Sequence, residues 1–270
     1  MDRDLRLMCV LAHPDDESMG TGGILARYAD EGVETYLLTA TGGERGWFGK
    51  EEEYPGPQEL ARIRHKELCE AARVLGLREV TTLGYCDGEL DQARPDEVIG
   101  KIVAHLRRIR PHVVVTFDPF GAYGHPDHIA ICQFTTAAIV AAADPGHEGR
   151  PPHRVSKLYY FVDTPEALAA YQEAFGELVI DVDDVTRSTR GWEPWAISAR
   201  IDTSGYWQQV WKAISCHRSQ LPGYQALLEL PEEHRRNLLD TQSFYRAFSL
   251  VNGGRSVERD LFAGLREGGD

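Results

Sequence analysis

Two short clusters of histidine and aspartate supply the side chains that catalytic metal sites use. One is His-Pro-Asp-Asp at residues 13–16, and the other is His-Pro-Asp-His at residues 125–128. A catalytic zinc ion commonly takes three protein ligands from His, Asp and Glu and keeps one position for water. Together the clusters hold more candidate groups than three ligands require. A spare carboxylate beside the metal-bound water would be a general base, which predicts metal-assisted hydrolysis.

The members of each cluster must divide between two roles. Side chains of neighbouring residues on an extended turn diverge, so one of Asp15 and Asp16 can reach the metal while the other cannot. If the proline of the second cluster starts a helix, His128 points from the first turn and His125 lies just outside it. Asp127 is then placed to support its neighbours by hydrogen bonding. Spacing alone leaves open which aspartate and which histidine bind the metal.

Each cluster directly follows an apolar run that predicts a buried parallel strand, at residues 7–11 and 112–117. Open α/β sheets bind ligands at the carboxyl ends of their strands, so the two clusters are expected to meet at one edge of the sheet. A single His-Pro-Asp is usually an ordinary turn at the start of a helix. Two of them after two predicted strands favour a site.

The rest of the chain alternates predicted strands and helices. Strands are expected at 5–11, 34–40, 80–83, 112–117 and 157–162, and helices at 22–30, 58–75, 95–109, 126–143 and from 164. This succession predicts an α/β fold with a Rossmann-like, doubly wound, mostly parallel sheet. A glycine-rich loop, 41–49, lies on the same edge as the first cluster.

The pattern is weaker after about residue 178. We expect strands at 178–181 and 195–202, a helix at 206–217, a helical stretch at 227–239 broken at Pro231, and a polar tail that frays from residue 253. No linker divides the chain. We therefore expect one domain over 1–270, with an α/β core (1–185) that carries the metal site and a C-terminal extension (186–270) packed on the sheet.

Composition narrows the classes of function. The net charge of −13 opposes nonspecific binding to nucleic acid or to an anionic membrane. No apolar stretch approaches the roughly 20 residues of a membrane span. The five cysteines are scattered and include no Cys-x-x-Cys pair, which is typical of a reducing compartment. The predicted location is the cytoplasm, with no nucleic-acid or membrane partner.

The motifs A-H-P-D-D-E at 12–17 and H-P-D-H at 125–128 resemble the PIG-L/LmbE-like family of zinc-dependent N-deacetylases. That family includes enzymes that deacetylate N-acetylglucosaminyl conjugates in mycothiol and bacillithiol synthesis, and the mycothiol-conjugate amidase. Further matches are T-x-G-E-x-G at 41–46, R-H-K-E-L at 64–68 and a tyrosine two residues before His125. The matches run in the order of the family to about residue 220.

The resemblance implies a division of roles for the first cluster and the metal. His13, Asp16 and His128 would bind Zn²⁺, with Fe²⁺ as the other candidate. Asp15 would be the general base. The substrate would be a small N-acetylated amino-sugar conjugate, and a homo-oligomer is compatible with the family.

The resemblance also implies roles around the substrate. His125 would be an imidazolium that stabilises the oxyanion or protonates the leaving amine, with Asp127 supporting it. Arg64, Asp87 and Tyr123 would contact the substrate.

Three other functions stay open from the sequence. The chain could cleave the amide of a mycothiol conjugate rather than an acetamide. A metal-dependent phosphoesterase would also place Asp and His at strand ends, but a two-metal site needs more ligands and no P-loop is present. A metal-binding relative without activity is disfavoured because Asp15 and His125 are both in place.

Overall fold

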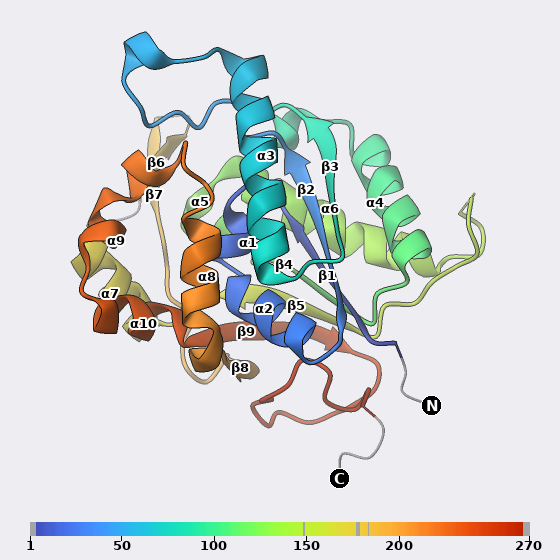
Figure 1. The fold of residues 1–270 in the computed structure, drawn as a ribbon. Helices are drawn as coiled ribbons and strands as arrows, with labels where there is room; N and C mark the ends of the chain where they lie inside the picture. Colours follow the sequence, from blue (N-terminus) through green and yellow to red (C-terminus); the bar gives the residue numbers. More distant parts are fainter. Residues whose placement is uncertain (1–3, 148, 177–178, 183, 267–270) are drawn as a thin grey trace.

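A central, mostly parallel sheet organises the molecule. The computed structural model describes residues 4–147, 149–176, 179–182 and 184–266 (Figure 1). In this part of the chain, seven strands form one sheet in the order β3-β2-β1-β4-β5-β9-β8. They are β1 (Arg6–Leu11), β2 (Glu34–Thr41), β3 (Glu79–Tyr85), β4 (Val113–Phe117), β5 (Lys157–Val162), β8 (Ala199–Asp202) and β9 (Thr241–Ser249). The predicted α/β class and doubly wound sheet are confirmed.

The direction of the strands explains where a site can form. β1 to β5 pair in parallel, whereas β9 pairs antiparallel with both β5 and β8. The chain runs outward from β1 through β2 to β3 and then returns to β4 on the other side of β1. This reversal is a topological switch point, and it opens a crevice at the carboxyl ends of β1 and β4. Both His-Pro-Asp clusters begin there.

Helices cover both faces of the sheet. One face carries α2 (Gly22–Asp30), α3 (Pro57–Leu75) and α8 (Trp207–Ile214), and the other carries α4 (Pro95–Ile109) and α6 (Pro126–Ala143) (Figure 1). The shorter helices are α1 (Asp16–Met19), α5 (Gly121–Gly124), α7 (Pro165–Phe175), α9 (Gln225–Glu229) and α10 (Glu232–Leu239). The 3₁₀ turns within the described residues are η1 (Glu51–Glu53), η2 (Leu90–Gln92), η3 (Ser204–Tyr206) and η4 (Leu221–Tyr224). None of the described helices is long and apolar enough to cross a bilayer.

The core forms where apolar strands meet apolar helix faces. β1 and β4 are buried along almost their whole length, as their continuous apolar sequences require in the middle of a parallel sheet. α6 contacts both β4 and its neighbouring helix α4, and most of its residues are apolar and buried. Its first residue is Pro126, and the His125 side chain accepts a hydrogen bond from the Asp127 amide. The proline and this hydrogen bond at the start of α6 together fix the position of the second cluster.

The C-terminal third departs from the sequence prediction in several places. β9 was not predicted, because TQSFYRAFS lacks an apolar run although the strand is paired on both sides. The strand expected at 195–202 forms only at Ala199–Asp202, and the helix expected at 206–217 ends at Ile214. The break at Pro231 is confirmed by the separation of α9 and α10.

A separate two-stranded hairpin consists of β6 (Val179–Val182) and β7 (Val185–Ser188). The strand β7 was not predicted. Leu178, the expected first residue of β6, lies outside the described residues. Whether the chain divides at residue 185 into core and extension stays a prediction.

The expected fraying from residue 253 is wrong for the described part of the tail. Leu261 and Phe262 are fully buried, and the Phe262 ring packs edge-on against Tyr28 with centroids 5.1 Å apart. Glu258 accepts a hydrogen bond of 2.7 Å from the buried Lys157 ammonium. A few widely spaced residues hold this segment against the core, and their spacing matches neither helical nor strand periodicity in the sequence.

Candidate active site

The first cluster follows β1 through a tight, strained turn. Asp15 has φ 118°, a left-handed conformation that is costly for a residue with a Cβ and is common at functional sites. α1 then starts at Asp16, whose Oδ2 accepts hydrogen bonds from the amides of His13 (2.7 Å) and Ala12 (3.1 Å). The turn therefore directs the Asp15 and Asp16 carboxylates differently, as the sequence predicted for neighbours on a turn.

The structure brings His13, Asp16 and His128 together. His13 Nδ1 lies 3.1 Å from His128 Nε2, and Asp16 presents Oδ2 to His13 Nδ1 (3.7 Å) and Oδ1 to His128 Nε2 (3.6 Å). Ligand atoms 2.0–2.2 Å from a tetrahedral metal are about 3.4 Å apart. The observed distances between these nitrogen and oxygen atoms are close to that value, so the two imidazoles and the carboxylate could bind one divalent cation. These three residues are thus a suitable ligand set.

His125 offers a competing ligand. Ligand atoms of His13, His125 and His128 all lie within 4.8 Å of one another. The His128 ring is fixed by stacking on Phe117, with centroids 3.8 Å apart and planes 11° from parallel. The geometry alone therefore allows either Asp16 or His125 as the third ligand.

The outer nitrogen of His13 is held by two carboxylates. Its Nε2 lies 3.1 Å from Asp87 Oδ1 and 3.2 Å from Asp127 Oδ2. Burial lowers the pKa of His13, but the hydrogen bonds with Asp127 and Asp87 outweigh it and raise the pKa to about 10. A carboxylate on the outer nitrogen of a metal-binding histidine fixes its tautomer and orientation. With Nε2 directed to these two carboxylates, Nδ1 faces His128 and Asp16.

The Asp127 carboxylate therefore contacts His13, whereas it was expected to support His125. It also accepts hydrogen bonds from the amides of Gly88 (2.7 Å) and Leu90 (3.0 Å). It is the Asp127 backbone amide that donates to His125, at 3.2 Å from Nδ1. Asp127 thereby joins the loop after β3 to the start of α6.

Two features oppose the charged His125 that the resemblance implied. Burial, together with the charge on His13, lowers the pKa of His125 to about 4. Its Nδ1 accepts the Asp127 amide proton, so this nitrogen carries no proton. With Nδ1 as an acceptor, Nε2 is the ring nitrogen left to donate.

Arg64, expected at the substrate, binds Asp15 and two loop carbonyls. This side chain is only 3% exposed, and its Nη2 lies 3.1 Å from Asp15 Oδ2. It also donates to the carbonyl of Gly43 (2.7 Å) and to that of Pro14. A Cβ at Gly43 would lie 2.5 Å from the guanidinium, and φ there is +65°. The glycine of the loop after β2 is therefore needed for Arg64 to reach Asp15.

Tyr123 lies beside both histidines of the second cluster. Its ring centroid is 5.4 Å from that of His128 and 5.9 Å from that of His125. Burial raises the pKa of Tyr123 above its ordinary value, so its hydroxyl stays protonated. Arg187 of β7 donates to the Gly124 carbonyl at 2.9 Å, which joins the β6–β7 hairpin to this loop.

Sequence reasoning missed two residues that contact Asp15. Glu17 is completely buried and accepts the Asp15 amide at 3.0 Å through Oε2, while its Oε1 lies 2.7 Å from His217 Nε2. Tyr224 of η4 donates its hydroxyl to Asp15 Oδ2 at 2.8 Å. Glu17 belongs to the A-H-P-D-D-E motif and could have been singled out. Tyr224 lies beyond the last family match and carries no sequence signal.

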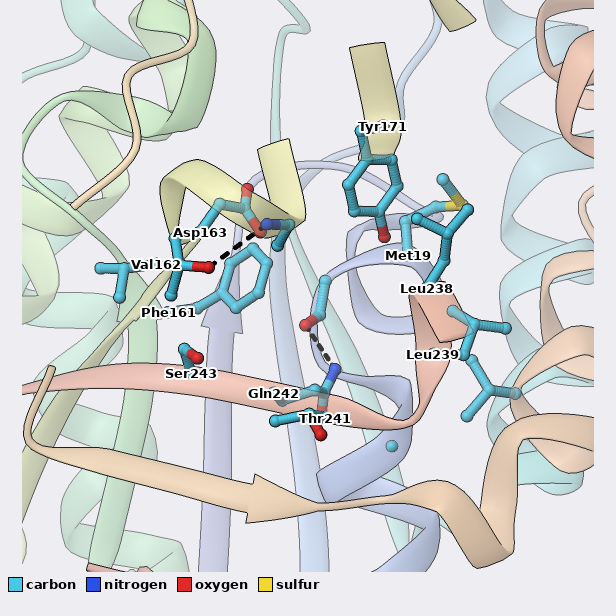
Figure 2. A pocket seen from close by; sticks show the side chains of 15 residues that line it. Met19, Phe161, Val162, Asp163, Tyr171, Leu238, Leu239, Thr241, Gln242 and Ser243 are labelled. Carbon is cyan, nitrogen blue, oxygen red and sulfur yellow. Dashed lines mark hydrogen bonds between the residues drawn. The ribbon is translucent and has the colours of Figure 1, made fainter. Parts of the chain in front are cut away.

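The far end of α1 is fixed by β9. A small cavity of about 40 Å³ lies there, and Figure 2 shows Met19, Asp163, Tyr171 and Gln242 among its lining residues. The Gln242 side chain donates to the Gly20 carbonyl (2.7 Å) and accepts from the Ile24 amide (2.7 Å). It thereby ties α1 to α2, so the unpredicted strand β9 helps to set the position of Asp16.

Comparisons with known proteins identify the family. A family model described as "PIG-L: GlcNAc-PI de-N-acetylase" matches residues 8–139, a span that contains both clusters. A 1D-myo-inositol 2-acetamido-2-deoxy-alpha-D-glucopyranoside deacetylase of Streptomyces griseus subsp. griseus is 35% identical, over 96% of this chain and 89% of that protein. A mycothiol S-conjugate amidase of Streptomyces coelicolor is 29% identical over 99% of each chain.

A solved structure shares the fold. The conserved protein TT1542 from Thermus thermophilus superposes with a TM-score of 0.65 and 29% identity, covering 92% of this chain and 97% of that one. The resemblance inferred from the two His-Pro-Asp motifs is confirmed. This chain belongs to the PIG-L family.

Proposed function

We propose that the protein is a metal-dependent N-deacetylase that removes the acetyl group from an N-acetylglucosamine conjugate. The observation that carries this proposal is the convergence of His13, Asp16 and His128 at 3.1–3.7 Å, directly beside Asp15. The relatives support the substrate class, because one is named as a deacetylase of an acetamido-glucopyranoside and another as a mycothiol S-conjugate amidase.

In this proposal His13, Asp16 and His128 hold the metal, with Zn²⁺ as first candidate and Fe²⁺ as second. When bound, such an ion would polarise the amide carbonyl and lower the pKa of a water molecule. Asp16 is preferred to His125 as third ligand because its carboxylate offers one oxygen to each imidazole and is oriented by two backbone amides. A carboxylate also contributes negative charge to a divalent site.

Asp15 is the proposed general base. One oxygen of its carboxylate, Oδ2, accepts hydrogen bonds from Arg64 and Tyr224. It accepts a proton from the attacking water as the water oxygen bonds to the carbonyl carbon. The carbon–nitrogen bond then breaks, the proton passes to the departing nitrogen, and acetate and a free amine result.

His125 is proposed to stabilise the developing oxyanion through its Nε2–H. A neutral donor in a largely buried site is effective because it needs no reorganisation as negative charge grows on the oxygen. Tyr123, beside the same ring, is proposed to contact the substrate.

Substrate contacts are also proposed for Arg64 and Asp87. Arg64 lies 3.1 Å from Asp15, and Asp87 lies 3.1 Å from His13. We therefore propose that both also position these reacting groups. An open groove of about 680 Å³ is lined by Pro14, which precedes Asp15 in the chain, and by Arg45, Arg62 and His65 among others. It offers room for the part of the conjugate beyond the amino sugar.

An S-conjugate amidase is the second candidate, and the observation that favours it is the 29% identity over the full length of both chains. The two activities use the same catalytic groups to cleave an amide and differ in the acyl group that is removed.

The five cysteines are all free in the structure. Cytoplasmic location and any homo-oligomer stay predictions.

The decisive test is an assay of zinc-loaded protein on three substrates. They are N-acetylglucosaminyl-inositol, a mycothiol S-conjugate and a generic phosphate ester, with free amine, acetate and phosphate as products. The proposal expects amine and acetate in equal amounts from the first, at a rate that Asp15→Asn lowers by about 10²-fold or more. Amine release from the S-conjugate alone would favour the amidase, and phosphate release alone would refute both.

A further inference from the structure

The Asp15 carboxylate is held asymmetrically. Its Oδ2 accepts the Tyr224 hydroxyl at 2.8 Å and the Arg64 guanidinium at 3.1 Å. Within the described part of the chain, every hydrogen bond to this carboxylate that the structure shows goes to Oδ2 and none to Oδ1. One oxygen is thus occupied by two donors.

We propose that Tyr224 is a positioning residue for the general base: it fixes the Asp15 carboxylate so that Oδ1 is the oxygen that takes the proton from water. This inference rests on the proposed role of Asp15 as the base. It assigns a role in the reaction to the segment after residue 220, where no family motif was found.

The physical need for such a residue follows from the torsions of aspartate. The Asp15 backbone is fixed by Glu17, which accepts its amide proton at 3.0 Å. The last side-chain torsion of aspartate is broad, so the carboxylate plane can still turn. A base must lie within hydrogen-bond reach of the proton it removes. Donors from two directions on Oδ2 restrict the turn, and they also make Oδ2 the less basic oxygen.

Tyr224 is itself well anchored for this task. Its ring packs against a small apolar cluster of Val210, Ile214, Leu227 and Leu239. Burial, followed by the charge of Asp15, raises the pKa of Tyr224 well above its ordinary value. The hydroxyl therefore remains a donor over the whole range in which the enzyme would work.

The test is Tyr224→Phe, which removes the hydroxyl and keeps the ring. Rates are normalised to folded, zinc-loaded protein, measured by metal analysis and thermal unfolding. We expect kcat to fall about tenfold to a hundredfold, as for the loss of a hydrogen bond to a charged group. KM should stay within about twofold, because substrate binding does not use this hydroxyl.

The matched control is Tyr206→Phe. The Tyr206 hydroxyl also donates to an aspartate, Asp30, at 2.8 Å, but on the surface. Its kcat should match wild type. The proposal is overturned if Tyr224→Phe keeps wild-type kcat, or if KM rises while kcat is retained, which would make Tyr224 a substrate contact. A fully active Asp15→Asn would instead refute the base itself.

Discussion

Replacing Glu17 by glutamine should destabilise the protein and slow its reaction together. Glu17 is 0% exposed and His217 is 1% exposed, so their 2.7 Å contact is shielded from water. Burial raises the pKa of Glu17, but the charge and hydrogen bond of His217 outweigh it and the pKa is lowered overall. The carboxylate also accepts hydrogen bonds from Ser18 (2.6 Å) and from the Asp15 amide (3.0 Å). An amide offers one acceptor oxygen where three donors converge.

The magnitude follows from these contacts. Removing one partner of a buried ion pair costs about 3–5 kcal/mol, and an amide of equal volume should lie near the lower value, about 3 kcal/mol. A chain of 270 residues has an unfolding entropy of roughly 0.6 kcal/mol per kelvin, so Tm should fall by about 5 °C. Loss of the bond to the strained Asp15 backbone should also lower kcat about tenfold, since left-handed strain of 1–3 kcal/mol is no longer offset.

The assay combines thermal unfolding with kcat per zinc-loaded protein. Glu258→Gln is the control, because Glu258 is also a buried carboxylate with several donors but belongs to the C-terminal segment. It should lower Tm and leave kcat unchanged. If Glu17→Gln unfolds within about 1 °C of wild type and retains kcat, the pair does not hold Asp15 in place.

Three further predictions address the ligands, the base and the pH dependence of stability. Asp16→Ala and His128→Ala should lose bound zinc in metal analysis, whereas His125→Ala should keep it; the reverse result for Asp16 and His125 would establish three histidine ligands. Asp15→Asn should keep zinc and lower kcat by about 10²–10⁴-fold, the usual contribution of a general base, and loss of metal would make Asp15 a ligand. Burial raises the pKa of Glu258, but its bonds from other side chains outweigh this and lower the pKa below 4.5. Its stabilisation is therefore present above pH 4.5 and lost as pH falls through the lower folded value. The difference in unfolding free energy between wild type and Glu258→Gln should shrink over that acid range in urea titrations, and a constant difference would contradict this reasoning.

Local sequence was sufficient for the half of the molecule that carries the reacting groups. The continuous apolar runs of β1 and β4 could only be buried strands, and the Pro126 helix start followed directly. Because parallel strands bring their carboxyl ends to one edge, both clusters were expected at the same edge of the sheet. The pairing of β1 with β4 then brings His13 to His128. These features depend on contacts between near neighbours or on a general rule of topology.

Other features depended on tertiary packing. The presence of Asp87 and Asp127 on the same nitrogen of His13 depends on how the loop after β3 meets α6. Tyr224 and Asp15 are 209 positions apart in the chain, and the sequence around either residue does not indicate a contact with the other. β9 was hidden because its few apolar side chains, such as the buried Phe244, do not form a run in the sequence, while β5 and β8 supply the backbone pairing on its two edges. The periodicity of apolar residues in a sequence indicates which face of a helix or strand is buried. Contacts between distant segments form only when the whole chain has packed, so local sequence does not predict them.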